Sequence, residues 1–421
     1  MPSFHPKGSV IAALDVGSSK IACFIGRIRD ENGNIDVIGV GHQASQGIKA
    51  GTVVDLDLAE SAIRQSVHTA EKMAADVTKG YPLREVIVNV PAIHTRSHLM
   101  NMNVQIMGQA ITDNDIRRAM AKAQSQIMAP ESELIHTIPT SYRIDGHDGI
   151  QEPRGLYGQN LDVDIHIVTG ASAPLRNIAG CIQASHLDIT ALCAAPYASG
   201  LACLVDDEMD MGCVVVDMGG GTTGIAIFYG KEMIFTDSVP VGGQHVTNDI
   251  AKGLTTSIQA AERMKALYGS AIATSTDDKD LIDVHPLGEE DPIQPNHIPR
   301  SYLVSIIAPR LEETLELVRA KIADSGLSHV AGRRVVLTGG ASQIPGLREL
   351  AQKYLEKQVR LGRPLRLPGL ADSVSGPAFS TTAGLLHYVT ERADEMPAEI
   401  MASVEDATLW ERVKLWLREN W

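Results

Sequence analysis

The sequence predicts an α/β fold of two lobes, because one strand–turn–strand pattern occurs twice along the chain. In the first copy, two short apolar runs flank the turn 15–20, which reads DVGSSK. In the second copy, similar runs flank the turn 217–224, which reads DMGGGTTG, so that Asp15 aligns with Asp217. Duplication of this kind is typical of folds built from two similar halves. The 3.6-residue periodicity that follows each copy predicts the helices of an α/β fold.

The composition excludes several classes of protein. The chain has 421 residues, of which 44% are apolar and 21% are charged, and this is enough for a buried core. The formal net charge is −14, which argues against nucleic acid as a partner, since phosphate binding needs clustered Lys and Arg. No apolar stretch is long enough to cross a membrane, and the N-terminus does not resemble a signal peptide. Five cysteines without C-x-x-C spacing predict free, buried thiols.

The secondary-structure elements are expected in the following order. The first half should contain strands at 10–14, 21–25, 85–90 and 102–107, and helices at 59–78 and directly after Thr112. The second half should contain strands at 213–216, 225–229 and 334–337, and helices at 246–268, 300–324 and 347–355. An acidic, proline-containing region at 271–299 is expected to form loops and short strands.

These elements suggest a division of the chain into subdomains. The first-lobe core is expected at 1–83 and 163–200, interrupted by an inserted α+β subdomain at 84–162. The second-lobe core is expected at 201–245, with an upper subdomain at 246–332, and 333–390 is expected to complete that core and to return to the first lobe. An acidic linker at 391–406 and an amphipathic helix at 407–421 complete the chain.

Glycines beside an aspartate at the end of a buried strand suit phosphate binding, because backbone N–H groups without a nearby Cβ can approach phosphate oxygens closely. The candidate phosphate contacts are Asp15, Gly17, Ser18, Ser19, Lys20, Asp217, Gly219, Gly220, Gly221, Thr222 and Thr223. Asp15 and Asp217 are also the candidate ligands of Mg²⁺, through its waters. Replacing Gly220 by Val is expected to strain the turn and to push a side chain toward the phosphates.

The glycine turns have two alternative interpretations. Ordinary structural turns are one alternative, but two matched copies and a third glycine turn at 338–342 disfavour it. The second copy also matches the G-x-G-x-x-G dinucleotide pattern at 219–224. That pattern must open a helix, whereas Gly224 runs directly into an apolar, strand-like stretch, so the sequence disfavours a Rossmann site.

Taken together, these motifs resemble the actin/Hsp70/sugar-kinase superfamily and, within it, the FtsA family of actin-like bacterial division proteins. The resemblance covers nearly the whole chain. It rests on the two aspartate turns, on 239–243 (VPVGG), 261–265 (AERMK) and 337–340 (LTGG), on the inserted subdomain and on the amphipathic C-terminus.

The resemblance implies a two-lobed actin-like ATPase fold with ATP and Mg²⁺ in the cleft. It places Gly243, Glu262 and Lys265 on one side of the ribose and adenine. Gly339, Gly340 and Ala341 are implied on the other side. For Glu262 and Lys265, a solvated helix face is the alternative.

The resemblance also implies a function. Such a protein binds ATP, self-associates into filaments, helps recruit other division proteins, and anchors the ring of the tubulin-like protein FtsZ to the cytoplasmic face of the inner membrane at the septum. Two alternatives stay open: a sugar or acyl kinase of the same superfamily, and a pilus-assembly relative. A kinase needs a carboxylate that accepts the substrate's proton, and no aspartate can be singled out for that role.

Weak hydrolysis is expected at most. Superfamily members that hydrolyse ATP often place Glu before Pro in the segment that resembles 194–198, and this chain has Ala195 before Pro196. Without that carboxylate, the attacking water is not oriented.

Two further sites concern partners. Arg300 and Arg310 lie ten residues apart on one predicted helix, and they are candidate receptors for the FtsZ C-terminal peptide, which is acidic and amphipathic in the family. Solvated surface arginines are the alternative for both.

In the tail, apolar residues recur on one face of a helix, and the charged residues lie mostly on the other face. This pattern is typical of a helix in a bilayer interface, although a helix docked on protein is the alternative. The candidate membrane-contacting residues are Leu409, Trp410, Val413, Trp416, Leu417 and Trp421.

Overall fold

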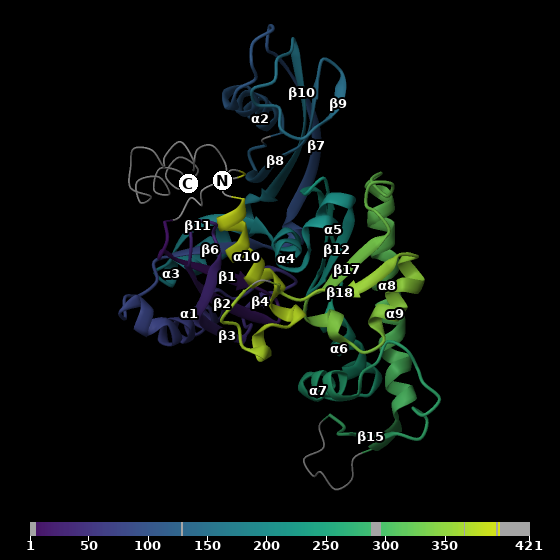
Figure 1. Ribbon diagram of the computed structural model, residues 1–421. Helices are drawn as coiled ribbons and strands as arrows, with labels where there is room; N and C mark the ends of the chain where they lie inside the picture. The colour runs from purple at the N-terminus through teal and green to yellow at the C-terminus, as the bar shows by residue number, and fades with distance from the viewer. Residues whose placement is uncertain (1–5, 128, 288–295, 366, 393–394, 396–421) are drawn as a thin grey trace.

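Figure 1 shows the fold in a computed structural model of the chain. The structure describes residues 6–392 and Glu395, except for residues 128, 288–295 and 366. The linker predicted at 391–406 therefore falls almost entirely outside the described residues, and the helix predicted at 407–421 falls wholly outside them.

The first lobe is built on a five-stranded mixed sheet with the order β11-β6-β1-β2-β3. Its strands are β1 (Val10–Val16), β2 (Lys20–Ile28), β3 (Ile35–Ala44), β6 (Glu85–Val90) and β11 (Asp188–Ala194). The predicted hairpin is confirmed, because β1 pairs antiparallel with β2 from Val10 opposite Arg27 to Val16 opposite Ile21. A short two-stranded sheet, β4 (Ile48–Lys49) with β5 (Thr52–Val53), leads into the first helix.

The second lobe repeats this plan. Its sheet has the order β14-β13-β12-β17-β18, so a hairpin, a third antiparallel strand and two parallel strands recur in the same arrangement. The strands are β12 (Cys213–Met218), β13 (Thr223–Tyr229), β14 (Glu232–Val239), β17 (Arg334–Thr338) and β18 (Gln358–Leu361). The duplication seen in the sequence is therefore a duplication of sheet topology.

Helices cover both faces of these sheets. Alternate residues of β1 point to opposite faces: Leu14 packs with α1 (Leu56–Thr78) and α3 (Ser172–Ala184), whereas Ala13 shares a core with α4 (Ala195–Cys203) and α10 (Ser380–Glu391). Residues of β12 belong to that same core. The helices α4 and α10 thus lie between the two sheets, as Figure 1 shows.

The inserted subdomain projects from the first lobe (Figure 1). Its four strands have the order β7-β10-β8-β9, and α2 (Asp113–Ile127) packs against the sheet. The strands are β7 (Thr95–Gln105), β8 (Ser132–Ile144), β9 (His147–Ile150) and β10 (Asn160–Ala171), and the short helix η1 (Ala92–His94) precedes them.

The border expected for this insertion at residue 84 needs correction. The strand β6 pairs with β1 and β11 in the first-lobe sheet, and the subdomain's own strands begin only at Thr95 and end at Ala171. Because β6 and β7 are separated by only a few residues, the sequence pattern alone could not show that the chain changes sheets there.

The single helix expected at 246–268 is also wrong. The structure has two helices, α6 (Gly243–Gly253) and α7 (Ile258–Tyr268), and Thr255 between them has a φ of 49°. The Ser257 hydroxyl accepts a hydrogen bond from the Ala260 N–H at 3.2 Å and caps the second helix.

The other expected helices of the second lobe are confirmed at the predicted positions, as α8 (Arg300–Asp324) and α9 (Leu347–Leu355). The acidic region contains the paired strands β15 (Leu281–Val284) and β16 (Asn296–Pro299). The remaining elements are α5 (Asp206–Met211), η2 (Gly340–Gln343), η3 (Asp372–Val374) and η4 (Pro377–Phe379). All five cysteines are free and buried. Among the described residues, no helix combines the length and apolar character of a membrane span.

Candidate functional site

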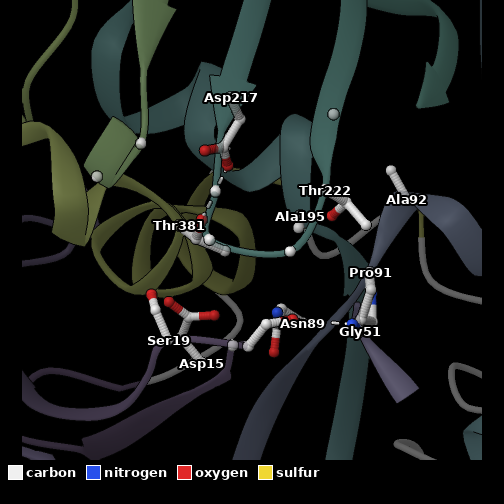
Figure 2. A pocket seen from close by; sticks show the side chains of 18 of the residues that line it. Asp15, Ser19, Gly51, Asn89, Pro91, Ala92, Ala195, Asp217, Thr222 and Thr381 are labelled. Atoms are coloured by element: carbon white, nitrogen blue, oxygen red, sulfur yellow. Dashed lines mark hydrogen bonds between the residues drawn. The ribbon is translucent and has the colours of Figure 1, made fainter. Parts of the chain in front are cut away.

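A cavity lies between the lobes, at the point where the two aspartate turns face each other (Figure 2). Asp15 enters it from the end of β1 and Asp217 from the end of β12. The lining residues are Asp15, Val16, Gly17, Ser18, Ser19, Lys20, Gly51, Asn89, Pro91, Ala92, Ala195, Pro196, Asp217, Gly219, Gly220, Gly221, Thr222, Gly224, Gly339, Gly340, Ala378 and Thr381. Their ionisable side chains are two carboxylates and one ammonium group, which is a suitable set for holding a metal ion with phosphates.

The first turn is fixed by contacts to its own lobe and to the chain's return segment. Asn89, at the end of β6, accepts a hydrogen bond from the Val16 N–H through Oδ1 at 2.7 Å. Lys20 places Nζ 3.7 Å from Asp15 Oδ2 and donates to the carbonyl of Ala378. The first turn therefore presents a partly exposed cation beside a buried carboxylate.

The second turn is fixed by buried hydroxyl groups and by a helix. Ser199 Oγ donates to Asp217 Oδ2 at 2.6 Å. The N–H groups of Gly243 and Gln244, which open α6, donate to the carbonyls of Gly219 and Gly220 at 2.9 and 2.8 Å. These first N–H groups of α6 are therefore already used in holding the second turn.

The glycines of the two turns are required by close approach between the lobes. A Cβ atom on Gly220 would lie 2.8 Å from Ser19 Cβ, and one on Gly221 would lie 2.6 Å from Ser18 Oγ. Neither glycine has a positive φ. The expectation that valine at position 220 strains the turn and points at phosphates is therefore corrected: its side chain would meet Ser19 of the opposite turn.

Both carboxylates have perturbed acidities. Burial raises the pKa of Asp15, and Lys20 and a hydrogen bond from Thr382 partly oppose that rise. Burial also raises the pKa of Asp217, and the charge of Asp15 raises it further. Two buried carboxylates that repel each other are stabilised by a cation placed between them.

The two aspartates and the glycine turns of the cavity are suitable for binding Mg²⁺ together with a nucleotide phosphate. Among the residues that the structure describes, no group of three or more metal-binding side chains lies together. Mg²⁺ commonly binds through one or two carboxylates together with water and phosphate oxygens, so two aspartates and a glycine turn are a sufficient protein contribution.

Twelve of the predicted contacts line this cavity, and five do not. Thr223 is fully buried in β13, where its hydroxyl donates to the Val241 carbonyl at 2.7 Å. Gly243, Glu262, Lys265 and Ala341 form a second group beside the cavity, and a Cβ on Gly243 would lie 3.0 Å from Ala341 Cβ.

Within this second group, Glu262 and Lys265 are tied to α6. Lys265 Nζ lies 2.7 Å from Glu262 Oε2, and it donates to the Gly243 carbonyl at 3.1 Å and to Thr247 Oγ1 at 2.8 Å. The side chain of Lys265 is 13% exposed. It therefore differs from the solvated lysine of the alternative interpretation.

Several cavity residues were missed by sequence reasoning. Asn89 gave a usable signal, because it is a polar residue within an apolar strand that ends beside the first turn. Gly51, Ala378 and Thr381 gave none, because they come from a tight turn and from the return segment, and only the folded chain brings these to the cleft.

Arg300 and Arg310 are both engaged in ion pairs within the second lobe. Arg300 Nη1 lies 3.0 Å from Asp277 Oδ1, and its Nε donates to the Tyr268 carbonyl at 2.9 Å. Arg310 Nε lies 2.6 Å from Asp249 Oδ2, and its other nitrogens also contact carboxylate oxygens. Neither arginine lines the cavity.

Comparison with protein families supports the resemblance noted in the sequence. The model of the family described as "Cell division protein FtsA" matches residues 214–384, and that of the "SHS2 domain inserted in FTSA" matches residues 92–169. The chain is 41% identical over 426 residues to the cell division protein FtsA of Rhizobium meliloti (strain 1021), covering 98% of this chain and 95% of that protein. It is 31% identical over 420 residues to that of Escherichia coli (strain K12), covering 98% of each.

Solved structures share the fold at much lower identity. A structure of the PilM-PilN type IV pilus biogenesis complex matches with a TM-score of 0.64 and 15% identity, covering 92% of this chain and 100% of that one. MreB5 of Spiroplasma citri bound to ADP matches with a TM-score of 0.53 and 12% identity, covering 93% and 98%. These likenesses confirm the two-lobed actin-like fold.

Proposed function

The chain belongs to the FtsA family of cell division proteins, and on that basis we propose that it anchors FtsZ to the cytoplasmic face of the inner membrane at the septum. Agreement with FtsA relatives over nearly the whole chain carries this proposal. In the same proposal the protein self-associates into actin-like filaments and helps recruit other division proteins.

The cavity is proposed to bind ATP with Mg²⁺. The turns at Asp15 and Asp217 supply N–H groups to the phosphates, Lys20 supplies a counter-charge, and the two carboxylates hold the cation through its waters. The group containing Gly243, Lys265 and Ala341 is proposed to contact ribose and adenine. Support comes from its position beside Gly219 and from the fold shared with an ADP-bound protein.

We propose that ATP serves mainly as a ligand that holds the two lobes together, with slow turnover. Ala195 lies in the cavity wall where a water-orienting carboxylate would be needed, and the carboxylates of the described lining are Asp15 and Asp217. A ligand that bridges the lobes stabilises the closed arrangement through binding alone. A turnover number near the enzyme median of about 10 s⁻¹ would contradict this proposal.

The FtsZ peptide is proposed to bind the second lobe's upper subdomain around Arg300 and Arg310. Exposed apolar side chains accompany Arg300: Tyr268 is 43% exposed and Tyr302 is 48% exposed. An acidic, amphipathic peptide would find both cations and apolar surface there. Because both arginines are already paired, the peptide must compete with Asp277 and Asp249 for them.

This competition can be tested by measuring how tightly the FtsZ C-terminal peptide binds to variants of the chain. Reversing both charges in Arg300→Glu/Arg310→Glu should abolish peptide binding to the full-length chain and leave ATP binding unchanged. The variant Asp249→Asn/Glu313→Gln removes both carboxylate partners of Arg310 and keeps the arginine, so it should bind the peptide more tightly than the unmodified chain. Unchanged peptide binding in both variants would move the site elsewhere.

Membrane attachment is proposed to reside in the tail, with Leu409, Trp410, Val413, Trp416, Leu417 and Trp421 in contact with lipid. All six residues lie outside the described part of the chain.

Of the proposed subdomains, the insertion is best defined as the sheet β7-β10-β8-β9 with α2. The segment 246–332 is proposed as the upper subdomain of the second lobe.

The family relationship disfavours the two alternatives. The PilM likeness is 15% identical and is a likeness of fold, whereas the FtsA relatives are 31–43% identical. A sugar or acyl kinase would need a third carboxylate as a base, and the described cavity lining offers only the two aspartates assigned to the cation.

A further inference from the structure

Two adjacent threonines at the start of α10 each donate a hydrogen bond to one of the two cavity aspartates. Thr382 Oγ1 donates to Asp15 Oδ2 at 3.3 Å, and Thr381 Oγ1 donates to Asp217 Oδ2 at 3.1 Å. Asp15 belongs to the hairpin of the first lobe and Asp217 to the hairpin of the second. One dipeptide therefore connects the two halves of the duplicated site.

These contacts are made in a region with little access to water. Thr382 is fully buried, and Asp15 and Asp217 are 5% and 9% exposed. Thr381 lines the cavity, and its hydroxyl also lies 3.0 Å from Ser199 Oγ, the other hydroxyl that bonds to Asp217. Loss of such a donor leaves an oxygen of a largely buried carboxylate without its partner, so the contacts restrict the positions of both carboxylates.

The bonds leave the same oxygen free on each aspartate. The hydroxyl contacts go to Oδ2 of Asp15 and to Oδ2 of Asp217. The ammonium group of Lys20 also lies nearest to Oδ2 of Asp15. Within the described part of the chain, the side-chain hydrogen bonds to Asp15 and Asp217 go to Oδ2 and none goes to Oδ1, and both residues line the cavity. The two Oδ1 atoms are therefore available to the waters of a cation.

The threonines are themselves held by the segment that precedes α10. The carbonyl of Ala378 accepts a hydrogen bond from Lys20, and the carbonyl of Pro377 accepts one from the Gly339 N–H at 3.1 Å. This segment thus contacts the first and the third glycine turns. In addition, no side-chain hydrogen bond caps the N-terminus of α10, so the two hydroxyls do not serve as caps of their own helix.

We propose that Thr381 and Thr382 are positioning residues for the cation of the bound nucleotide. They hold the Oδ2 atoms of the two aspartates and so orient both carboxylates, whose Oδ1 atoms would then be left to the waters of a bound Mg²⁺ ion. This inference rests on the proposed ATP site. It adds that the cation-dependent part of ATP affinity depends on the two hydroxyls that bond to the aspartates.

The test measures ATP affinity of the full-length chain with Mg²⁺ and again with EDTA. Thr381→Val and Thr382→Val keep the side-chain volume and remove the donor, whereas Thr381→Ser and Thr382→Ser keep the hydroxyl. The valine variants should lose about tenfold or more of the Mg²⁺-dependent gain in affinity and keep the EDTA value, because a bond to a charged group is lost. The serine variants should keep the full gain.

A matched control lies on the same helix. Thr390 Oγ1 bonds to the carbonyl of His387 within α10 at 3.2 Å and is far from the cavity, so Thr390→Val should keep the Mg²⁺ dependence unchanged. Should the fully buried Thr382→Val not fold, Thr381→Val alone decides the question, since Thr381 is only partly buried.

Three results would overturn the inference. Equal Mg²⁺ dependence in the valine variants and the unmodified chain would show that the hydroxyls do not position the cation. An equal loss of affinity with Mg²⁺ and with EDTA would show that the two hydroxyls stabilise the arrangement of the lobes and do not position the cation. An unmodified chain that binds no ATP would contradict the proposed nucleotide site itself, and the inference would fall with it.

Discussion

At the residue scale, Gly220 is needed because the two turns touch. A Cβ atom on Gly220 would lie 2.8 Å from Ser19 Cβ, which belongs to the other lobe and cannot move aside as a flexible side-chain end could. Gly220→Val should force the turns apart and lower ATP affinity by about tenfold or more, since phosphate binding needs both turns in place. Equilibrium ATP titration of the full-length chain measures this change.

A glycine on α3 provides the control for this variant. A Cβ atom on Gly180 meets nothing within 4 Å, so Gly180→Val should leave ATP affinity unchanged. If Gly220→Val bound ATP as tightly as the control variant, the assignment of the turns to the phosphates would be wrong.

Two buried histidines predict an acid-sensitive stability. Burial lowers the pKa of His136 to about 3 and that of His166 to about 4. His166 Nδ1 donates to the Met233 carbonyl at 2.8 Å, which fixes the neutral ring between the inserted subdomain and β14. Since the folded pKa lies below the unfolded value of about 6.5, stability is intact above pH 6.5 and falls as the pH drops toward 4.

The expected loss is about 2 kcal/mol per histidine between pH 7 and pH 5. Urea unfolding at the two pH values measures it. His166→Gln cannot take up this proton, so the variant should lose less stability between pH 7 and pH 5 than the unmodified chain. Identical pH dependence in both proteins would show that His166 is not held neutral.

The site's aspartates could be predicted from the sequence, and its supporting hydroxyls could not. Asp15 and Asp217 stand in a repeated local pattern that carries its own chemical meaning. Thr381 and Ser199 are ordinary residues of apolar helices, and their contacts to Asp217 arise only because α10 and α4 cross between the sheets.

At the element scale, local signals located α1, α2, α8 and α9, whereas α3, α4, α5 and α10 were not expected. The predicted bounds of α8 and α9 agree with the structure because apolar periodicity and flanking turns mark their ends. The third strand of each sheet, β3 or β14, was not expected, since each follows a hairpin without a distinctive motif. The break near Thr255 was missed because Ala and Leu continue the helical pattern on both sides of it.

The helices α4 and α10 approach each other closely beside the site. A Cβ atom on Gly384 would lie 1.6 Å from the backbone carbonyl oxygen of Ala198, so the two helices can meet only at glycine. Gly384→Ala must separate them and should cost at least about 3 kcal/mol of unfolding free energy. Chemical denaturation of the full-length chain measures the loss.

The matched control for this variant is again Gly180. It also lies within a helix, but its missing Cβ faces open space, so Gly180→Ala should be neutral or stabilise by up to about 1 kcal/mol. A Gly384→Ala variant as stable as Gly180→Ala would mean that the helices do not cross as closely as described.

At the scale of the whole molecule, duplication explains why so much of the architecture could be predicted. Two copies of one pattern predicted two lobes, and the sheets repeat the same strand order around β1 and β12. The border of the insertion was misplaced because β6 and β7 both have strand-like sequences but pair in different sheets. Which sheet a strand joins depends on its partners, and these lie far away in the sequence.

Attachment to a membrane depends on the whole chain, because the proposed anchor is in the tail and the proposed self-association is in the lobes. In helical spacing, residues 407–421 place Trp and Leu on one face and mainly charged residues on the other, and an acidic sequence precedes them. A helix this short should bind lipid weakly and reversibly as a monomer. Self-association presents many tails at once, which multiplies attachment without any new contact per molecule.

Co-sedimentation with anionic vesicles tests this under conditions that allow assembly. The intact chain should pellet, whereas truncation after Asp406 and Trp416→Glu should abolish or strongly reduce pelleting, because each removes apolar contact with the bilayer interface. Glu419→Gln changes only the polar face and should pellet like the intact chain. Equal pelleting of the intact chain, the truncation and Trp416→Glu would exclude the tail as the membrane anchor, because attachment would then arise elsewhere on the protein.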